Sequence, residues 1–181
     1  MTAKVFLAVS FVILFSGCAA ILDRTAIFHK AKPAPTSLVH LEQGKSVFVA
    51  VPGDSTFGGV SYLGSGRTVA EAIARAFSKR GVTVHVAGKQ LTDEDAVAAA
   101  VQLKAGYVVQ AVITRWEHRN GWFGYPDRVA VRITVVDVAT GRVIAARSIE
   151  KRGRIVSVTT ETPDSLLEDP LCQFANGLYR F

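Results

Sequence analysis

The sequence feature that most restricts the fold is the apolar run Tyr107-Val-Val-Gln-Ala-Val-Ile113, which carries no charge and is rich in β-branched residues. A strand that is apolar on both faces has to be buried on both faces, as the central strands of a sheet are. Residues 107–113 are therefore predicted to form a central strand. The rest of the chain must supply further strands beside it and helices to cover it.

The segments around this run alternate between strand and helix patterns. Residues 46–52 form a second apolar run that ends at a proline, and residues 129–136 alternate between apolar and polar side chains. The predicted order is β-α-β-α-β-β-β-α, with strands at 46–52, 82–87, 107–113, 129–136 and 142–150 and helices at 68–80, at 92–104 and from 169 onward. This order predicts an α/β (α+β) domain with a single mixed β-sheet at residues 45–181.

The predicted helices begin at residues that favour a helix N-terminus. Thr68 and Glu71 have the spacing of a capping box, in which each side chain binds the backbone amide of the other residue. Thr92 precedes three acidic residues, which interact favourably with the dipole of a helix. The last helix is expected to start at Asp169-Pro170.

A glycine-rich segment, residues 53–66, precedes the first of these helices and suggests an anion site. Gly64, Ser65, Gly66 and Thr68 would present backbone N–H groups at a helix N-terminus, where anions bind. The segment lacks the lysine that follows the glycine of a phosphate-binding P-loop. A tight turn that leads into a capped helix is the alternative interpretation.

The first 17 residues have the features of a secretory signal peptide. Lys4 gives a positive start, residues 5–16 carry no charge, and small residues follow. Ser16-Gly17-Cys18 resembles the lipobox of bacterial lipoproteins, whose cysteine receives a diacylglycerol and fatty acids such as palmitate. The resemblance implies a membrane anchor at Cys18, because acyl chains contribute about 0.8 kcal/mol per buried CH₂ group. An uncleaved anchor over residues 5–22 is the alternative.

A lipid anchor implies a position in the cell envelope. Ala19 stands where an aspartate retains enteric lipoproteins in the inner membrane, so the resemblance implies the outer membrane, with the domain in the periplasm. Residues 18–44, which include Pro33 and Pro35, are expected to form an extended tether between the acylated cysteine and the domain. After cleavage at Cys18, Cys172 is the second and last cysteine, so no disulfide can form within the chain.

Positive charge is concentrated in the last predicted hairpin. The chain has 21 Lys and Arg and 15 Asp and Glu residues, a formal net charge of +6. Residues 128–154 contain most of this excess, and Arg152 and Arg154 are candidates for binding an anionic envelope surface. A solvated sheet face is the alternative. Export disfavours nucleic acid as a partner.

The register of this hairpin can be predicted from its turn. Asp137-Val-Ala-Thr-Gly141 supplies the turn, with Gly141 suited to a left-handed conformation. In that register Arg132 lies diagonal to Glu150. Arg147 falls opposite Ile133 on the apolar face, which requires a bulge or an edge strand there.

The connection after the central strand contains the segment Arg119-Asn-Gly-Trp-Phe-Gly-Tyr-Pro126. Connecting loops lie at the surface, and Trp and Tyr are frequent anchors of protein interfaces. Trp122, Phe123 and Tyr125 are therefore candidates for docking another envelope protein. The alternative is that these rings fold back over an exposed end of the sheet.

No residue pattern predicts catalysis, a metal site or a cofactor. The four histidines lack the spacing of metal-binding pairs. Glu117 and Asp127 flank one loop and are explained as a strand-end and a turn residue. Cys172 adjoins Leu171 and Phe174 and is expected to be a small buried apolar residue. We expect a protein that is not an enzyme, and the sequence does not specify its oligomeric state.

Several short motifs resemble those of proteobacterial lipoproteins grouped as a domain of unknown function. The resemblance rests on Tyr62-Leu-Gly-Ser-Gly66, Trp116-Glu117, Pro126-Asp-Arg128 and Thr140-Gly141. In the order of its elements the chain is also similar to the α/β domains of the curli-secretion lipoprotein and of the Tol-system periplasmic protein. The family has no established activity, so it implies no catalytic residues. The expectation is a lipid-anchored binding or assembly accessory. A small-ligand-binding domain that uses the glycine segment, or a cryptic hydrolase, is the alternative.

Overall fold

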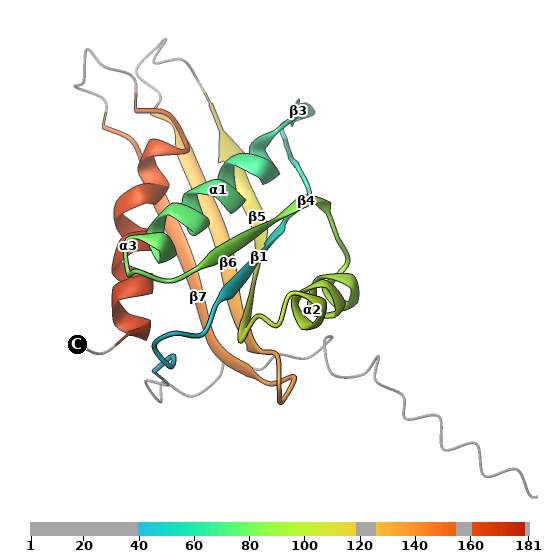
Figure 1. Ribbon diagram of the computed structural model, residues 1–181. Coiled ribbons are helices and arrows are strands. Elements are labelled where there is room, and N and C mark those ends of the chain that lie inside the picture. The colour runs from blue at the N-terminus through green and yellow to red at the C-terminus, as the bar shows by residue number, and fades with distance from the viewer. Residues whose placement is uncertain (1–39, 119–125, 155–160, 180–181) are drawn as a thin grey trace, which may run out of the picture. The chain divides into compact units, whose positions relative to one another are not determined.

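A five-stranded sheet organises the described residues, which are 40–118, 126–154 and 161–179 of a computed structural model (Figure 1). The strand order is β4-β1-β5-β6-β7. The strands of this sheet are β1 (Val47–Val51), β4 (Val84–Gln90), β5 (Tyr107–Glu117), β6 (Arg128–Asp137) and β7 (Val143–Arg152). β5 contains the predicted central run and is the middle strand of the five, so that prediction is confirmed.

The sheet is mixed, as predicted. β1 pairs in parallel with both β4 and β5, whereas β5, β6 and β7 form an antiparallel meander. All five residues of β1 are buried, which agrees with its apolar sequence. β1 is thus covered on both of its faces.

Three helices complete the fold: α1 (Ser65–Ser78), α2 (Asp93–Gln102) and α3 (Ser165–Leu178). α1 and α3 pack against each other in front of the sheet in the view of Figure 1, and α3 also contacts β6 and β7. α2 contacts β5 and β1. Ile73, Phe77, Leu167 and Ile133 are among the largest fully buried side chains, which places the core between α1, α3 and the sheet. In the described part of the chain, no helix is long and apolar enough to cross a membrane.

The predicted order of elements is confirmed, with one hairpin added. β2 (Ser55–Phe57) and β3 (Val60–Tyr62) pair within the segment that was expected to be a glycine-rich loop. Gly58 and Gly59 have φ angles of 59° and 79°. A two-residue turn with both φ angles positive joins strands with the correct twist, and two glycines between β-forming residues are its usual signal. That signal was present in the sequence and was missed.

Two predicted boundaries were wrong. β4 spans residues 84–90 and not 82–87. α3 begins at Ser165, so Pro170 lies inside the helix and does not start it. Leu167 and Leu171 lie one turn apart and are both fully buried, and their burial favours the longer helix over a start at the proline.

The predicted register of the last hairpin is confirmed. Ile133 pairs with Arg147, and Arg132 pairs with Ser148, which makes it diagonal to Glu150. Ile133 is fully buried, whereas Arg147 is exposed. β7 is the last strand of the sheet, so a long charged side chain on its inner face can still reach solvent past the edge.

Candidate functional site

The start of α1 differs from the predicted capping box. The helix begins at Ser65, and Gly64 precedes it with a φ angle of 85°. The Thr68 hydroxyl donates to the carbonyl oxygen of Gly64 over 3.0 Å. The predicted pairing of Thr68 with Glu71 is therefore wrong. A left-handed residue two positions after the end of β3 reverses the chain, and glycine adopts that conformation without strain.

The amides at this helix start bind a carboxylate of the same chain. Gly64 N–H donates to Asp54 Oδ2 over 3.0 Å, and Gly66 N–H donates to Asp54 Oδ1 over 2.8 Å. These two hydrogen bonds lower the pKa of Asp54, because they stabilise its charged form. A ligand anion would have to displace Asp54, so anion binding by this segment stays a prediction.

Ser65 and Gly66 have structural roles in the same segment. The Ser65 hydroxyl is buried and accepts a hydrogen bond from Ser55 N–H over 2.9 Å. A Cβ atom on Gly66 would lie 2.1 Å from the carbonyl oxygen of Pro52, which is far inside van der Waals contact. The Gly64-Ser65-Gly66 sequence is thus needed for the chain to pack closely around Asp54.

A cleft of about 270 Å³ lies beside this helix start. Its lining comes from three segments that are far apart in the sequence: Tyr62, Leu63, Gly64, Ser65 and Thr68; Trp116 and His118; and Thr162, Pro163 and Asp164. A larger depression, of about 630 Å³, is lined by α1 residues alone. One helix cannot enclose a ligand, so the cleft formed by three segments is the better candidate site.

His118 is the most distinctive polar side chain of the cleft. Its Nδ1 atom lies 2.6 Å from Oδ2 of Asp127. The Asp127 side chain is 3% exposed, and the His118 side chain is 37% exposed. A buried carboxylate that binds one ring nitrogen fixes the orientation of the imidazole, which leaves Nε2 for other contacts. The two residues flank the same loop in the sequence, which was the only signal for their contact.

Among the described residues, no serine or threonine hydroxyl is hydrogen-bonded to His118. Glu117 precedes His118 in β5, and its Oε1 atom lies 3.5 Å from Nε of Arg115. The hydroxyl of Ser65 lines the cleft but is already hydrogen-bonded and buried. The arrangement can orient a bound polar molecule, and it offers no activated serine in the described residues.

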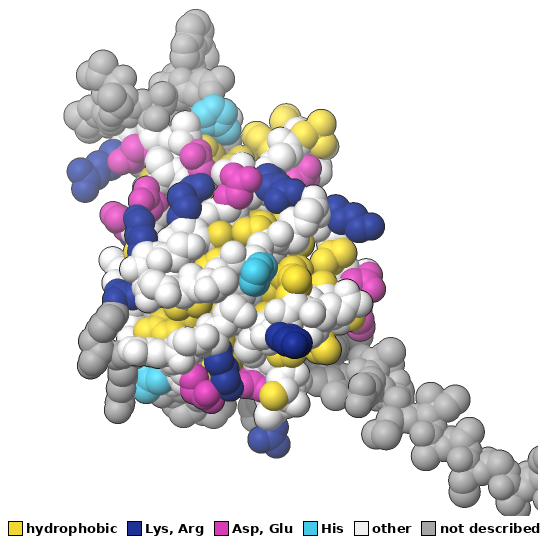
Figure 2. Space-filling view, viewed as in Figure 1, with side chains coloured by type: hydrophobic (Ala, Val, Ile, Leu, Met, Phe, Trp, Pro, Cys, Tyr) yellow, Lys and Arg dark blue, Asp and Glu magenta, His cyan; other side chains and the backbone are white. Residues whose placement is uncertain are grey.

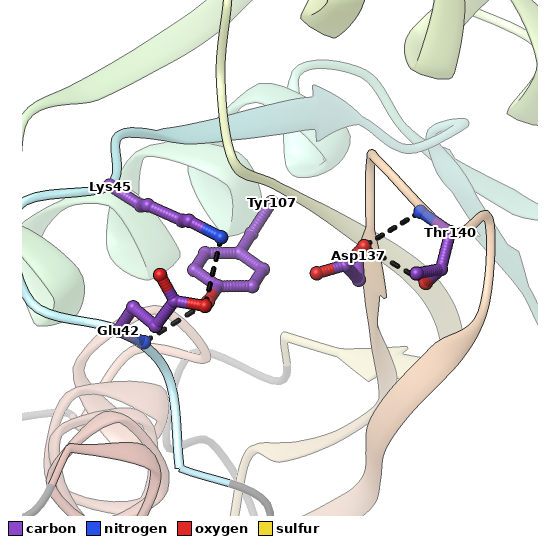
Figure 3. Close-up of polar contacts among 5 residues, drawn as sticks. All are labelled: Glu42, Lys45, Tyr107, Asp137 and Thr140. Atoms are coloured by element: carbon purple, nitrogen blue, oxygen red, sulfur yellow. Dashed lines mark hydrogen bonds and ion pairs between the residues drawn. The ribbon is translucent and has the colours of Figure 1, made fainter.

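The chain enters the domain at the opposite end of β5 (Figure 3). Leu41 N–H donates to the carbonyl oxygen of Leu178 over 2.7 Å, and Glu42 N–H donates to the Tyr107 hydroxyl over 3.0 Å. Lys45 Nζ lies 3.0 Å from Oε1 of Glu42 and 5.7 Å from the centre of the Tyr107 ring. β5 begins at Tyr107, and at about 3.3 Å per residue it separates the entry point from the cleft by roughly 30 Å.

The turn between β6 and β7 lies at the same end as the chain entry. Asp137 Oδ1 accepts hydrogen bonds from Thr140 N–H over 2.8 Å and from the Thr140 hydroxyl over 2.9 Å (Figure 3). Gly141 has a φ angle of 66°, so the predicted left-handed glycine is confirmed. These contacts show that the Thr140-Gly141 motif has a structural role in the turn.

Several predicted site residues lie outside the described residues. They are Cys18, Trp122, Phe123 and Tyr125. Arg152 and Arg154 are described and exposed, and Arg154 N–H donates to Glu161 Oε2 over 2.7 Å. Neither guanidinium group has an ion pair with a described residue, so their use in binding stays a prediction.

Cys172 is only partly buried, which differs from the expected buried apolar role. Nζ of Lys79 lies 3.7 Å from its Sγ atom and 2.7 Å from Oε1 of Glu168. Across residues 40–118, 126–154 and 161–179, no three His, Cys, Asp or Glu side chains are grouped so that they could hold a metal ion.

Figure 2 shows that charged side chains of both signs gather at the end of the molecule where the cyan side chain of a histidine lies uppermost, while the middle of this face carries more hydrophobic and uncharged atoms.

The comparisons with known proteins concern the fold and the family. No curated protein matches the sequence significantly. The PelC dodecamer from Paraburkholderia phytofirmans has a similar fold, with a TM-score of 0.62 and 20% identity over 78% of this chain and 92% of that chain. Lipoprotein GNA1162 from Neisseria meningitidis matches with a TM-score of 0.50 and 15% identity over 74% of this chain and 99% of that chain.

A third solved structure, TolB from Acinetobacter baumannii, matches with a TM-score of 0.41 and 11% identity over 76% of this chain and 28% of that chain. At these identities, the likeness to PelC and to GNA1162 concerns the fold alone. A family model matches residues 39–178, which include nearly all of the described residues and both ends of the sheet. The chain therefore belongs to the family described as Domain of unknown function (DUF4823).

Proposed function

We propose that this protein is a lipid-anchored lipoprotein of the cell envelope that acts as a non-catalytic binding or assembly accessory. The observation that carries the proposal is the leader with Lys4 and the uncharged residues 5–16, which ends in Ser16-Gly17-Cys18 ahead of a folded domain. Two proteins with a similar fold support it. One is named a lipoprotein, and the other is described as a dodecamer.

The layout of the domain fits an anchored accessory. The chain enters at the Tyr107 end of β5, and the cleft with His118 lies at the other end. The tether joins the domain at the first of these ends, and we call the end with the cleft the free end. In our proposal that free end, in the periplasm and at the outer membrane, meets the partner.

The candidate partner residues neighbour residues of the free end in the sequence. Trp122, Phe123 and Tyr125 fall between His118 and Pro126 in the sequence. Arg152 closes β7 and pairs with Arg128, which itself pairs with the last residue of β5. We propose that aromatic and basic side chains act together there, since aromatic anchors supply contact area and charges speed the encounter.

The anchor is tested by comparing the two cysteines of the chain. Cells that express Cys18→Ser or Cys172→Ser are fed an alkyne-tagged palmitate. We expect Cys18→Ser to lose the label and to accumulate the longer precursor, whereas Cys172→Ser is labelled like the wild type. Full labelling of Cys18→Ser contradicts the proposed anchor.

The accessory role is tested by crosslinking in intact cells. We expect Trp122→Ala with Tyr125→Ala to lose crosslinked envelope proteins and to keep the thermal stability of the wild type. Lys45→Ala, at the opposite end of the domain, is the matched control and should keep the crosslinks. A loss of several kcal/mol of stability in the aromatic variant would mean that the rings are buried in the fold and do not dock a partner.

The cleft favours a second candidate function, the binding of a small ligand. The specific observation is that three segments line it and that Asp127 orients His118 within it. Native mass spectrometry of the protein purified from its host should detect a small bound molecule. We expect His118→Ala to lose this molecule and His85→Ala, on β4, to keep it. An identical spectrum for both variants contradicts a ligand held by His118.

A further inference from the structure

The two edges of the main sheet are built differently. At the β4 edge, pairing with β1 is irregular between the Val49–Val86 and Val51–Gln90 pairs. The Arg67 side chain binds the irregular part of β4. Its Nη1 and Nη2 atoms donate to the carbonyl oxygens of Ala87 and Gly88 over 3.0 and 2.6 Å. An irregular strand whose carbonyl groups are already bound is a poor template for another strand.

The β7 edge is regular. Its pairing with β6 keeps one register from the pair of Val135 with Ala145 to the pair of Arg128 with Arg152. β7 is the last strand in the order, so no strand of the described residues lies on its outer side. Between Ala146 and Arg152 every residue except Ile149 is exposed. Such an edge presents a row of main-chain N–H and C=O groups to which an extended chain can bind.

The charges along the β7 edge indicate which kind of polypeptide segment could pair with it. Arg147, Lys151 and Arg152 are exposed and form no ion pair with a described residue. The acidic residue of this stretch, Glu150, has its Oε1 atom 3.9 Å from Nη1 of Arg115. Pairing of two β7 strands would bring these basic groups together, which disfavours a second copy of this chain.

We infer that the β7 edge, residues Ala146–Arg152, accepts an extended acidic segment of another protein as a sixth strand of the sheet. Main-chain hydrogen bonds supply the attachment, and carboxylates of the incoming strand pair with Arg147 and Lys151, which lie on one face of β7. Alternate residues of a strand point to opposite faces, so acidic residues at every second position suit Arg147 and Lys151. This inference does not depend on the lipid anchor.

The test uses the full-length protein in detergent micelles and three labelled twelve-residue peptides. The probe alternates Thr with Glu. The first control has the same number of Glu residues but arranges them in pairs that alternate with pairs of prolines, so that it keeps the charge and lacks N–H groups on both sides of an extended strand. The second control alternates Thr with Lys. Fluorescence anisotropy measures binding, and hydrogen exchange measures the protection of β7 and β4 amides.

We expect the Thr–Glu probe to bind at least about tenfold more tightly than either control and to protect amides of β7 but not of β4. The variant Arg147→Glu with Lys151→Glu should lose about tenfold or more in affinity. Lys89→Glu with Arg142→Glu has the same change in charge away from the β7 edge and should lose less than threefold. Thermal melting followed by circular dichroism checks that both variants fold.

Three results would overturn the inference. Equal binding of the proline peptide means that charge alone attracts the probe, without strand pairing. No binding of the probe means that the basic residues only guard the edge against aggregation. Protection of β7 that rises with protein concentration in the absence of peptide means that a second copy of this chain occupies the edge.

Discussion

The N-termini of α1 and α2 obtain hydrogen-bond acceptors for their backbone N–H groups in two different ways. Each helix leaves backbone N–H groups at its N-terminus that need acceptors. In α2 the acceptor is local, because the Thr92 hydroxyl accepts from Asp95 N–H over 3.1 Å. In α1 the acceptor comes from a distance, because Asp54 reaches the amides of Gly64 and Gly66 across the β2–β3 hairpin.

The difference decides how each helix start depends on the rest of the fold. The α2 cap needs residues that are already neighbours in the sequence, so the helix start is stabilised as soon as the helix forms. The α1 cap exists only when Pro52, Asp54 and the hairpin are in place. Substitutions at the start of α1 should therefore weaken the packing of the whole domain. Substitutions at the start of α2 should weaken that helix alone.

The largest effect is expected for Gly66→Ala. The new Cβ atom would lie 2.1 Å from the Pro52 carbonyl oxygen, so the main chain has to move and the Asp54 contacts are lost with it. We expect a loss of about 3 kcal/mol or more in the free energy of unfolding, measured by urea denaturation. Gly177→Ala in α3 is the control, since no atom lies within 4 Å of its added Cβ, and alanine should raise stability by up to about 1 kcal/mol.

The next effect is expected for Asp54→Asn. The amide keeps the shape of the carboxylate, but only its oxygen can accept, so one of the hydrogen bonds from Gly64 and Gly66 is lost together with the charge that strengthens the other. We expect a loss of about 2 kcal/mol at pH 7 in the same denaturation experiment. A loss below about 0.5 kcal/mol would mean that the distant cap contributes little and that the two helix starts do not differ as we argue.

The charge of Asp54 also predicts how this loss depends on pH. Hydrogen bonds from the Gly64 and Gly66 amides hold the pKa of Asp54 below its ordinary value of 3.8. A carboxyl group with a lowered pKa in the folded state stabilises the fold above the pKa of the unfolded state, and this contribution disappears as the pH falls through the folded pKa. The difference between wild type and Asp54→Asn should therefore be constant above about pH 5 and should shrink below about pH 4. A difference that stays constant down to pH 3 contradicts the role of the charge.

A smaller effect is expected for Thr92→Ala at the local cap. The loss of one capping hydroxyl should cost about 1 kcal/mol in the free energy of unfolding. The slope of the denaturation curve should stay unchanged, because the rest of the domain keeps its packing. Hydrogen exchange should speed up in the first turn of α2 and remain slow in β1.

The smallest effect is expected for Thr68→Val. The Thr68 hydroxyl donates to a carbonyl oxygen within the first turn of α1 and caps no amide, so its removal should change stability by less than about 0.5 kcal/mol. A loss of about 1 kcal/mol or more would mean that the Thr68 hydroxyl contributes to the helix start as much as a capping group does, which contradicts our comparison.

The contrast between the two helix starts also explains what could be predicted from the sequence. The central position of β5, the mixed sheet and the Ile133–Arg147 pair depend on hydrophobic pattern and turn geometry, which are local signals, and all three are confirmed. The start of α1 depends on Asp54, whose contact forms only after the hairpin folds. A search for short-range motifs found Thr68 and Glu71 instead.

The candidate site was less predictable than the fold. The cleft joins residues of three separate segments, and no spacing rule relates Ser65, Trp116 and Asp164 in the sequence. The contact of His118 with Asp127 has a weak signal, since both residues flank one loop of an antiparallel pair. A site that forms where several segments end becomes visible only when their tertiary packing is known.

The position of β1 in the sheet has a consequence for how the chain folds as it emerges from its N-terminus. β1 is the first strand in the sequence, yet Val47 pairs with Val84 on one side and with Tyr107 on the other. A chain that is synthesised from its N-terminus delivers β1 before either partner strand. The antiparallel meander of β5, β6 and β7 can form from segments that are neighbours in the sequence. β1 is apolar and remains unpaired until residues much later in the sequence are available. Its late insertion makes the fully buried strand the one most exposed to misassociation while the domain folds.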